Sequence, residues 1–207
     1  MKKVIKSLLI LSVAFTLNSC VSEDDTALPS LKIPFFEEGF ENVEQTGVID
    51  FEGWSNVSLN GGSKLWETRY YSADGTYAQL SAFGSGETNM DTWLITPAVD
   101  LEQTTSEALR FAYKAAYYNG QALSVWVSTD YDGSNTAEGI NNANWTNLNV
   151  DLPDYATSGY PSTFSQSPIL DLSSYSGQIY IAFRYQGSSS GVSTTYQIDN
   201  IIIFENK

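Results

Sequence analysis

The sequence predicts an all-β protein, a two-sheet antiparallel β-sandwich of the jelly-roll type. Apolar and polar residues alternate with a period of two, most clearly at 109–114, 123–128 and 179–185. Clusters of Gly, Asn, Asp and Ser separate such runs, for example at 60–63 and 130–133. No segment carries a 3.6-residue apolar stripe over three helical turns. Nine or ten short strands with turns between them favour a sandwich over other all-β folds.

The first element in the chain is an export signal. Three lysines precede an apolar run at 8–17, and Leu17-Asn18-Ser19-Cys20 ends that run. About ten apolar residues are too few to span a bilayer core of roughly 30 Å as a helix. The ending resembles the lipobox of bacterial lipoproteins, which implies that 1–19 is a lipoprotein signal peptide and that Cys20 is acylated. The alternative is an ordinary signal peptide with an incidental cysteine.

The next segment, 20–33, is predicted to be a lipidated flexible tether. Its acidic cluster at 23–25 resembles the tag that sends lipoproteins of gut-anaerobe type to the outer face of the outer membrane. A solvated linker is the simpler explanation of the same residues. We therefore expect a protein that is anchored by lipid to the outer membrane and faces the cell exterior.

Residues 34–207 are predicted to form the sandwich domain. Besides the three alternating runs, β-rich segments occur at 64–71, 76–83, 92–99, 145–151 and 195–204. The domain is long enough to bury a substantial core. Cys20 is the only cysteine, so the domain has no disulfide and depends on its core, or on a metal, for stability. Within the core we expect Trp93 or Leu94 to be buried between the sheets.

Composition excludes several classes of function. The formal charge is −14, and it becomes −17 when the three lysines of the leader are removed, which argues against a nucleic-acid partner. The chain has no histidine, so Ser-His-Asp triads and His-ligated zinc are excluded. A carboxylate pair could still hydrolyse glycans. The Glu-x-Asp-x-x-Glu signature of laminarinase-type jelly rolls is absent from the sequence, however, and we predict that the protein is not an enzyme.

Six short motifs occur in a fixed order along the domain: Gly39-Phe40-Glu41, Gly53-Trp54, the run 91–97 (DTWLITP), 125–130 (VWVSTD), 179–184 (IYIAFR) and 198–201 (IDNI). This series resembles the choice-of-anchor J and cleaved-adhesin jelly rolls, the modules repeated in gingipain-type haemagglutinins. The resemblance covers about 35–204. It implies a jelly roll of a mostly non-catalytic family associated with adhesion, glycan binding or anchoring.

The same resemblance implies a structural calcium. Sandwich modules of this kind often hold the ion between the first and last strands, with carboxylate and carbonyl oxygens as ligands. Glu41 and Asp199 match the two carboxylates, and Asp91 is a third candidate ligand. The alternative is that Glu41 is a solvated strand residue and that Asp199 caps a local turn.

Strand alternation suggests a second site, because it turns the side chains between the core positions outward. These outward residues include five that suit sugar binding: Arg110, Lys114, Trp126, Tyr180 and Arg184. An aromatic ring stacks on the apolar face of a sugar, and Arg or Lys donates hydrogen bonds to its hydroxyls. Alternatively, a loop covers Trp126 and the arginines pair with local acids. Aromatic residues expected in loops are rival platforms: Trp66, Tyr70, Tyr71, Tyr117 and Tyr118.

Together these observations predict a surface-anchored, non-catalytic binding module, with glycan as the expected ligand and a polysaccharide-uptake or adhesion system as its context. One alternative is a structural or adhesive lipoprotein that contacts other proteins. The other is a carboxylate-based glycan hydrolase.

Overall fold

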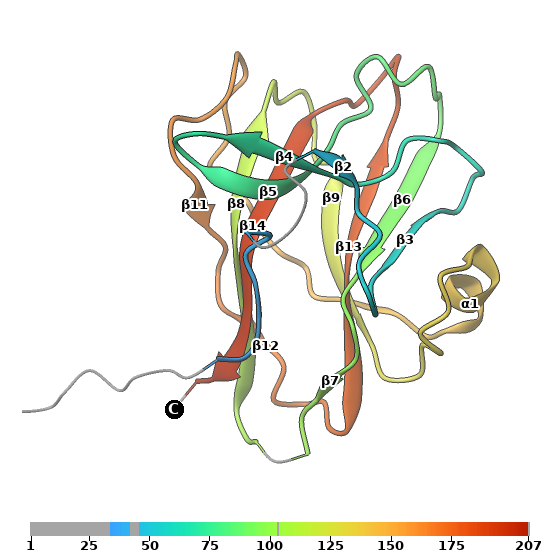
Figure 1. The fold of residues 1–207 in the computed structure, drawn as a ribbon, viewed down its shortest axis with the longest axis vertical. Coiled ribbons are helices and arrows are strands. Elements are labelled where there is room, and N and C mark those ends of the chain that lie inside the picture. The colour runs from blue at the N-terminus through green and yellow to red at the C-terminus, as the bar shows by residue number, and fades with distance from the viewer. Residues whose placement is uncertain (1–33, 42–45, 103, 207) are drawn as a thin grey trace, which may run out of the picture. The chain divides into compact units, whose positions relative to one another are not determined.

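The computed structural model describes residues 34–41, 46–102 and 104–206. The predicted signal peptide (1–19), Cys20 and the tether (20–33) lie outside the described residues. Within the described ranges the protein is almost entirely β-structure, arranged as two antiparallel sheets packed against each other (Figure 1). The predicted β-sandwich is therefore confirmed.

We call the eight-stranded sheet sheet A. Its strand order is β11-β8-β14-β5-β4-β2, with β1 paired to β14 and β12 paired to β8. Its strands are β1 (Pro34–Glu38), β2 (Gly47–Val48), β4 (Glu67–Tyr71), β5 (Gly75–Leu80), β8 (Glu107–Ala116), β11 (Ser165–Gln166), β12 (Leu170–Asp171) and β14 (Thr195–Glu205).

The six-stranded sheet is sheet B. Its strand order is β10-β9-β13-β6-β3, with β7 paired to β13. Its strands are β3 (Ser55–Ser58), β6 (Met90–Ile95), β7 (Val99–Asp100), β9 (Leu123–Ser128), β10 (Thr146–Asn147) and β13 (Gln178–Gly187). The predicted run 145–151 thus contributes only the two-residue strand β10.

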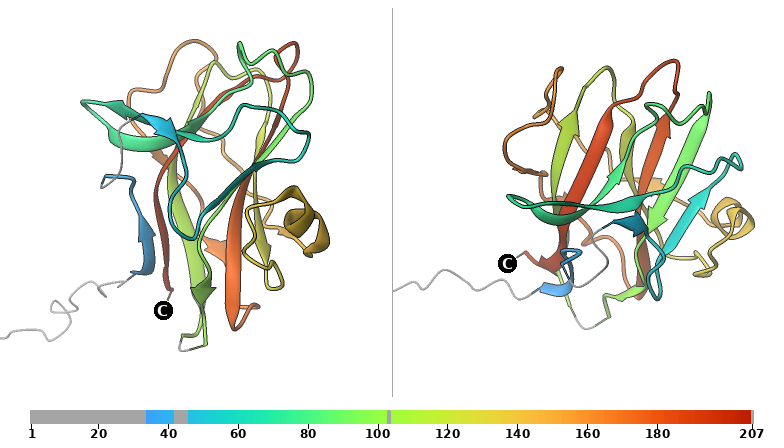
Figure 2. Two further views of the ribbon diagram at one scale, coloured as in Figure 1. Left: turned by 45° about the vertical axis from the view of Figure 1, so that its right-hand side comes forward. Right: turned by 45° about the horizontal axis from the view of Figure 1, so that its top comes forward.

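The chain passes repeatedly from one sheet to the other. It crosses between β5 and β6, between β8 and β9, and between β13 and β14, so the order β8-β14-β5 in sheet A is matched by β9-β13-β6 in sheet B. The two views in Figure 2 show these long strands in two layers. Antiparallel pairs that continue from one sheet into the other are the jelly-roll arrangement.

The core lies between the sheets and follows the predicted alternation. Val125 and Val127 on β9 face inward, as do Ile181 and Phe183 on β13. Phe183 meets Phe111 of the opposite sheet edge-to-face, with ring centroids 5.1 Å apart.

Two further large side chains test the expected core. Leu94 is fully buried in this inter-sheet core, as predicted, whereas its neighbour Trp93 packs on the outer side of sheet B. Trp66 is 0% exposed and also belongs to the core, so it is not an exposed loop aromatic.

One short helix, α1 (Ala137–Asn142), covers part of the outer face of sheet B (Figure 2). Thr136 is its N-cap, with Oγ1 accepting a hydrogen bond from the Gly139 backbone N–H at 3.1 Å. Ile140 packs against the outer side of the sheet. Six residues are too few to show helical periodicity in the sequence. In the described part of the chain, no helix is both long and apolar enough to cross a bilayer.

Candidate functional site

The five residues predicted to form one outward platform lie on two different sheets. Arg110 and Lys114 are on β8 in sheet A, whereas Trp126, Tyr180 and Arg184 are on β9 and β13 in sheet B. All five do point away from the core. The prediction of a single platform is nevertheless wrong, because β8 pairs with β14 rather than with β13.

On sheet B, Trp126 packs against a cluster of aromatic side chains and Arg184. The Arg184 guanidinium lies 4.9 Å from the Trp93 ring centroid and 5.5 Å from that of Trp126. Arg184 also donates two hydrogen bonds to Asp91, from Nε at 2.8 Å and from Nη2 at 2.5 Å. Trp145 packs on Trp93 from the loop after α1, with centroids 5.0 Å apart. Arg184 therefore pairs with a local acid, as the alternative expects, and Trp126 is half-buried against this cluster.

Sheet A carries a groove of about 760 Å³ on its outer face. The groove is lined by β4, β5, the turn between them, β8, β14 and the segment 160–162: Arg69, Tyr70, Tyr71, Ala73, Asp74, Tyr77, Gln79, Lys114, Tyr160, Pro161, Ser162 and Gln197. These residues share a face because strands β4, β5, β14 and β8 are consecutive neighbours, so their outward side chains stand side by side.

Tyrosines form the rim and one wall of the groove. Tyr70 is 47% exposed, Tyr71 is 59% exposed and Tyr160 is 49% exposed. Deeper in the groove, burial raises the pKa of the Tyr77 phenol, whose ring meets Phe164 edge-to-face at 5.7 Å. Burial raises the pKa of Tyr160 as well, so both phenols stay protonated hydrogen-bond donors at neutral pH. Tyr117, a predicted rival platform, packs edge-to-face on Tyr160 at 5.5 Å.

Both cations of the groove are held by carboxylates. Lys114 Nζ lies 2.6 Å from Asp74 Oδ2, and both side chains are largely buried. Arg69 Nη2 lies 2.7 Å from Glu67 Oε1. Partial burial by itself would raise the pKa of Glu67, but hydrogen bonds from Lys64 and Arg69 outweigh it and hold that pKa below its usual value. The two lining cations are thus positioned as hydrogen-bond donors that already have counter-charges.

Two polar atoms of the groove residues have no hydrogen-bond partner among the residues that the structure describes. Gln197 is 3% exposed; its Nε2 donates to Gln79 Oε1 at 2.9 Å, but its Oε1 accepts no hydrogen bond. Arg69 Nε is likewise buried and unpaired. Buried polar atoms are normally paired, because losing solvent without a partner is costly. An unpaired acceptor and an unpaired donor in one groove are two positions where a water molecule or a polar ligand group would complete the hydrogen bonding.

The three predicted metal-binding carboxylates do not come together. Asp91 is on the outer face of sheet B and is engaged by Arg184, so it is not a ligand at the strand-terminal site. Glu41 and Asp199 lie near each other, and the negative charge of Glu41 contributes to raising the pKa of Asp199. No group of three or more Asp or Glu side chains is placed to hold a metal ion within 34–41, 46–102 and 104–206.

The surroundings of Asp199 are unusual for a carboxylate. Burial first, and then the nearby acids Glu41, Glu38 and Asp74, raise its pKa to about 7, although it accepts a hydrogen bond from the Asn200 backbone N–H at 2.7 Å. Asp199 is only 4% exposed. The Glu41 carboxylate lies so close to Gly75 of β5 (φ +79°) that a Cβ atom at this position would overlap it.

The sequence pattern marked Tyr70, Tyr71 and Lys114 but not the other lining residues, among them Tyr77, Gln79 and Gln197. These three residues alternate with core positions on β5 or β14, so alternation alone could have marked them as outward. Their meeting in one groove depends on the pairing of Gln79 with Gln197 across the two strands. That pairing is a long-range contact that no local pattern encodes.

A model of one known protein family matches this domain. The family model for a domain of unknown function, DUF5017, matches residues 75–206, which is more than half of the chain. The chain belongs to this family. The matched range runs from β5 to β14 and so includes most of the groove of this DUF5017 domain. Among curated proteins, no sequence matches the chain.

Solved structures confirm the cleaved-adhesin-like fold. The K1 and K3 cleaved adhesin domains of Lys-gingipain from Porphyromonas gingivalis W83 are 22% and 19% identical, with TM-scores of 0.53 and 0.54. Each alignment covers 83% of this chain, and 98% of K1 or 99% of K3. The K2 cleaved adhesin domain of Lys-gingipain is 17% identical with a TM-score of 0.60, over 82% of this chain and 98% of that domain. At these identities the likeness concerns the fold alone.

Proposed function

We propose that the protein is a non-catalytic binding module and that it holds a glycan in the groove of sheet A. The observation that carries the proposal is the combination of exposed Tyr70 and Tyr71 with the buried, unpaired Gln197 Oε1 in one open groove. Sugars present an apolar face to aromatic rings and hydroxyls to polar side chains. An open groove suits a chain-like ligand better than a small molecule, which needs an enclosed pocket.

The carboxylates of the groove argue for binding rather than hydrolysis. Glycosidases need two carboxyl groups that flank the scissile bond, one of them free to donate a proton. Among the described residues that line the groove, Asp74 is the only carboxylate, and Lys114 holds it at 2.6 Å. This supports a non-catalytic role for the groove.

Replacing Tyr71 by Ala should weaken glycan binding about tenfold, equivalent to about 1.4 kcal/mol, because the stacking surface is lost. The change should leave the melting temperature within a few degrees, since Tyr71 is 59% exposed. Binding is measured by titration with whichever polysaccharide the wild-type chain retains. Phe83→Ala is the matched control, because Phe83 is 81% exposed and does not line the groove. Equal losses in both variants would refute the assignment to this groove.

The outer face of sheet B is the competing platform. Trp126 packs against Trp93 and Arg184 there, so Trp126→Ala should lower stability without reducing affinity for glycan. Loss of binding in a folded Trp126→Ala protein would move the site to sheet B. Binding of proteins but of no glycan would favour the adhesive alternative.

A structural calcium near Asp199 is a further part of the proposal. The site would use Glu41 and Asp199, with backbone carbonyls and water completing the ligand set that calcium requires. The donor chemistry fits, because Asp199 is a buried carboxylate whose pKa is raised by neighbouring acids, and a divalent cation would compensate these negative charges. The ion would tie the end of β1 to β14.

Calcium in the millimolar range should raise the melting temperature of the wild-type chain. A ligand that binds only the folded state stabilises it by about 2.7 kcal/mol at a hundredfold excess over Kd. Asp199→Ala should abolish the rise, whereas Asp91→Ala should retain it, because Asp91 is on the other sheet. Identical wild-type melting curves in calcium and in chelator would remove the ion from the proposal.

We also propose that the protein is anchored by lipid at Cys20 to the outer membrane and faces the cell exterior. The support is the Leu17–Cys20 motif after a basic and apolar leader. Each buried methylene of an acyl chain contributes about 0.8 kcal/mol to membrane binding.

Cys20→Ala should therefore release the protein from the membrane fraction. Continued membrane association of that variant in detergent-free buffer would refute the lipid anchor. Protease treatment of intact cells tests the orientation separately, since a periplasmic domain would survive it.

A further inference from the structure

We infer that the groove of sheet A selects uncharged glycans over acidic ones, an inference that rests on the proposed function. It follows from the way in which the cations of the groove are already paired and from the kinds of polar atom that are left free. Three independent features of the groove lead to it.

The first feature is the buried ion pair in the floor. Lys114 Nζ is 2.6 Å from Asp74 Oδ2, with side chains only 4% and 12% exposed, and it lies 4.8 Å from the centroid of the Phe164 ring. An acidic sugar that formed its own ion pair with this ammonium group would compete with Asp74 for it. That exchange would leave the Asp74 carboxylate buried and unpaired, which is strongly unfavourable. Lys114 is therefore a structural cation here and does not attract anionic ligands.

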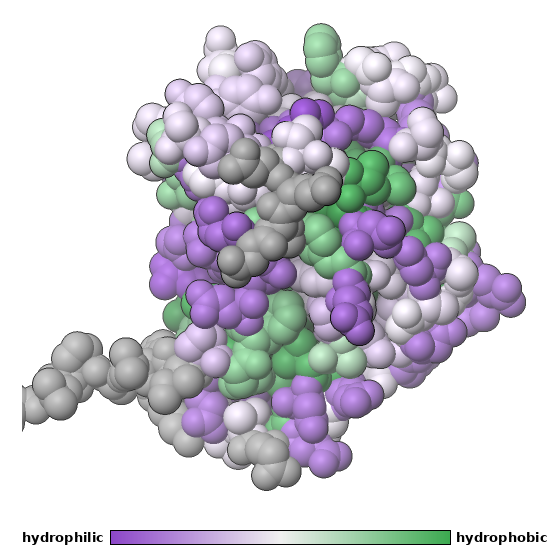
Figure 3. Space-filling view, in the orientation of Figure 1, coloured by the Kyte–Doolittle hydropathy of each residue, from purple (hydrophilic) through white to green (hydrophobic). Residues whose placement is uncertain are grey.

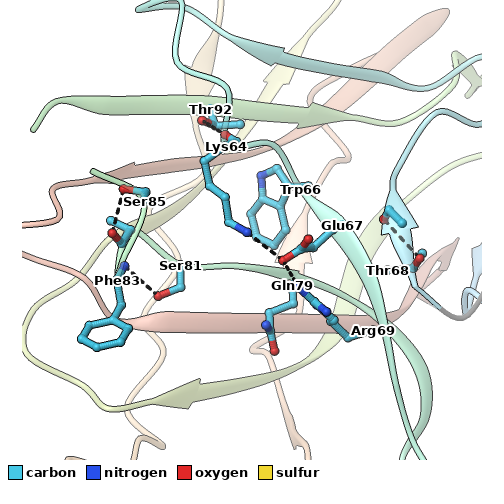
Figure 4. A network of polar contacts seen from close by, with 12 residues as sticks. Lys64, Trp66, Glu67, Thr68, Arg69, Gln79, Ser81, Phe83, Ser85 and Thr92 are labelled. Carbon is cyan, nitrogen blue, oxygen red and sulfur yellow. Dashed lines mark hydrogen bonds and ion pairs between the residues drawn. The ribbon is translucent and has the colours of Figure 1, made fainter. Parts of the chain in front are cut away.

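The second feature is the paired guanidinium on β4. Figure 4 shows Glu67 between Lys64 and Arg69, with its carboxylate directed at both, and Gln79 on the neighbouring strand. Arg69 thus retains N–H donors while its charge is compensated by Glu67. Both cations that line the groove are thus paired with carboxylates, so neither offers an uncompensated positive charge to an anion.

The third feature is the character of the unpaired atoms. Gln197 Oε1 is an acceptor and needs a donor from the ligand, whereas Arg69 Nε is a donor and needs an acceptor. A sugar hydroxyl can act as either. A carboxylate or sulfate group only accepts, so it would leave Gln197 Oε1 unpaired at a cost. The two free atoms together match a hydroxyl-rich, neutral ligand.

The face of the molecule shown in Figure 3 is consistent with a polar, uncharged ligand. Figure 3 shows hydrophobic residues in separate patches between hydrophilic ones on the face in view, rather than as one continuous apolar surface. The formal net charge of −14 adds a general repulsion toward polyanions.

The test is affinity electrophoresis of the full-length chain through gels that contain a single polysaccharide. The neutral probes are xyloglucan, galactomannan, laminarin and pullulan; the acidic probes are alginate, polygalacturonate and chondroitin sulfate. We expect at least tenfold tighter binding to one or more neutral probes than to any acidic probe. Retention should change less than twofold between 20 and 300 mM NaCl, because no ion pair forms with the ligand.

Two substitutions make the test specific. Gln197→Leu removes the unpaired acceptor at similar volume and should weaken neutral-glycan binding at least tenfold. The change removes an unsatisfied buried acceptor but also the hydrogen bond from Gln197 Nε2 to Gln79 Oε1. The fold should survive, because Gln79 is only half-buried and its Oε1 can accept from water instead. Gln186→Leu is the matched control, since Gln186 is exposed on sheet B. Glu67→Gln releases the charge of Arg69 and should increase retention by acidic probes severalfold, in a manner that high salt suppresses.

Each outcome is decisive. Salt-sensitive binding of acidic probes by the wild type, lost in Gln197→Leu, would overturn the charge selectivity and leave the glycan-binding groove intact. Neutral binding unaffected by Gln197→Leu would overturn the assignment to this groove. Retention by none of the seven probes would overturn both the proposed function and the selectivity.

Discussion

Phe183→Ala is expected to destabilise the domain by about 3–5 kcal/mol, which is a large share of the stability of a typical domain. Phe183 is 0% exposed at the centre of β13 and packs edge-to-face on Phe111 of the opposite sheet at 5.1 Å. Truncation leaves a cavity between the two sheets, and β-strands fixed by neighbours on both sides cannot collapse into it. Urea denaturation followed by tryptophan fluorescence measures the change.

Phe83→Ala provides the matched comparison, because the same atoms are removed from a side chain that is 81% exposed. Its effect should stay within about 0.5 kcal/mol. A loss below 1 kcal/mol for Phe183→Ala would contradict the two-sheet core. A double variant with Phe111→Ala should lose less than the sum of the two single losses, because both remove the same contact.

The sequence could predict which residues share a face of one strand, because side-chain direction alternates along β-structure. Val125 and Val127 point into the core and Trp126 points out, as alternation requires. It could not predict which sheet each strand joins. The outward residues Lys114 and Trp126 were expected together, yet they lie on different sheets, because strand order depends on long-range pairing.

The candidate groove illustrates the same limit at the level of function. Tyr70 and Tyr71 are recognisable as exposed aromatics from their position before the turn at 72–74. Gln197 cannot be recognised as a binding residue from the sequence. Its proposed role depends on the unpaired Oε1 atom, and the neighbours of Gln197 come from β5 and β8. Asp199 was found through a family resemblance. Its raised pKa depends on burial in the folded sheet, which a composition rich in acids does not reveal.

Asp199→Asn is expected to stabilise the metal-free domain at pH 8. The folded-state pKa is raised to about 7, from an ordinary value of 3.8, chiefly by burial. The folded state therefore binds a proton more tightly than the unfolded state, so stability falls as the pH rises from about 4 to about 7 and is constant above that. At about 1.4 kcal/mol per unit, the ionised carboxylate costs roughly 4 kcal/mol above pH 7. Asparagine imitates the neutral carboxyl and should avoid most of this cost.

The measurement is urea denaturation in chelator between pH 4.5 and pH 8.5. Wild type should lose stability across this range relative to Asp199→Asn, whereas the exposed Asp50→Asn control should follow wild type. Parallel pH profiles for wild type and Asp199→Asn would show that Asp199 titrates normally in the folded state.

Excess calcium should reverse the order of the two proteins at pH 8. The ion would compensate the buried charge of wild-type Asp199, while the amide of the variant is a weaker ligand for a hard cation. The same substitution would then stabilise the metal-free protein and destabilise the calcium-loaded one. A variant that remains more stable than wild type at every calcium concentration would mean that Asp199 is a buried acid without a metal, held in the sheet at a cost to folding.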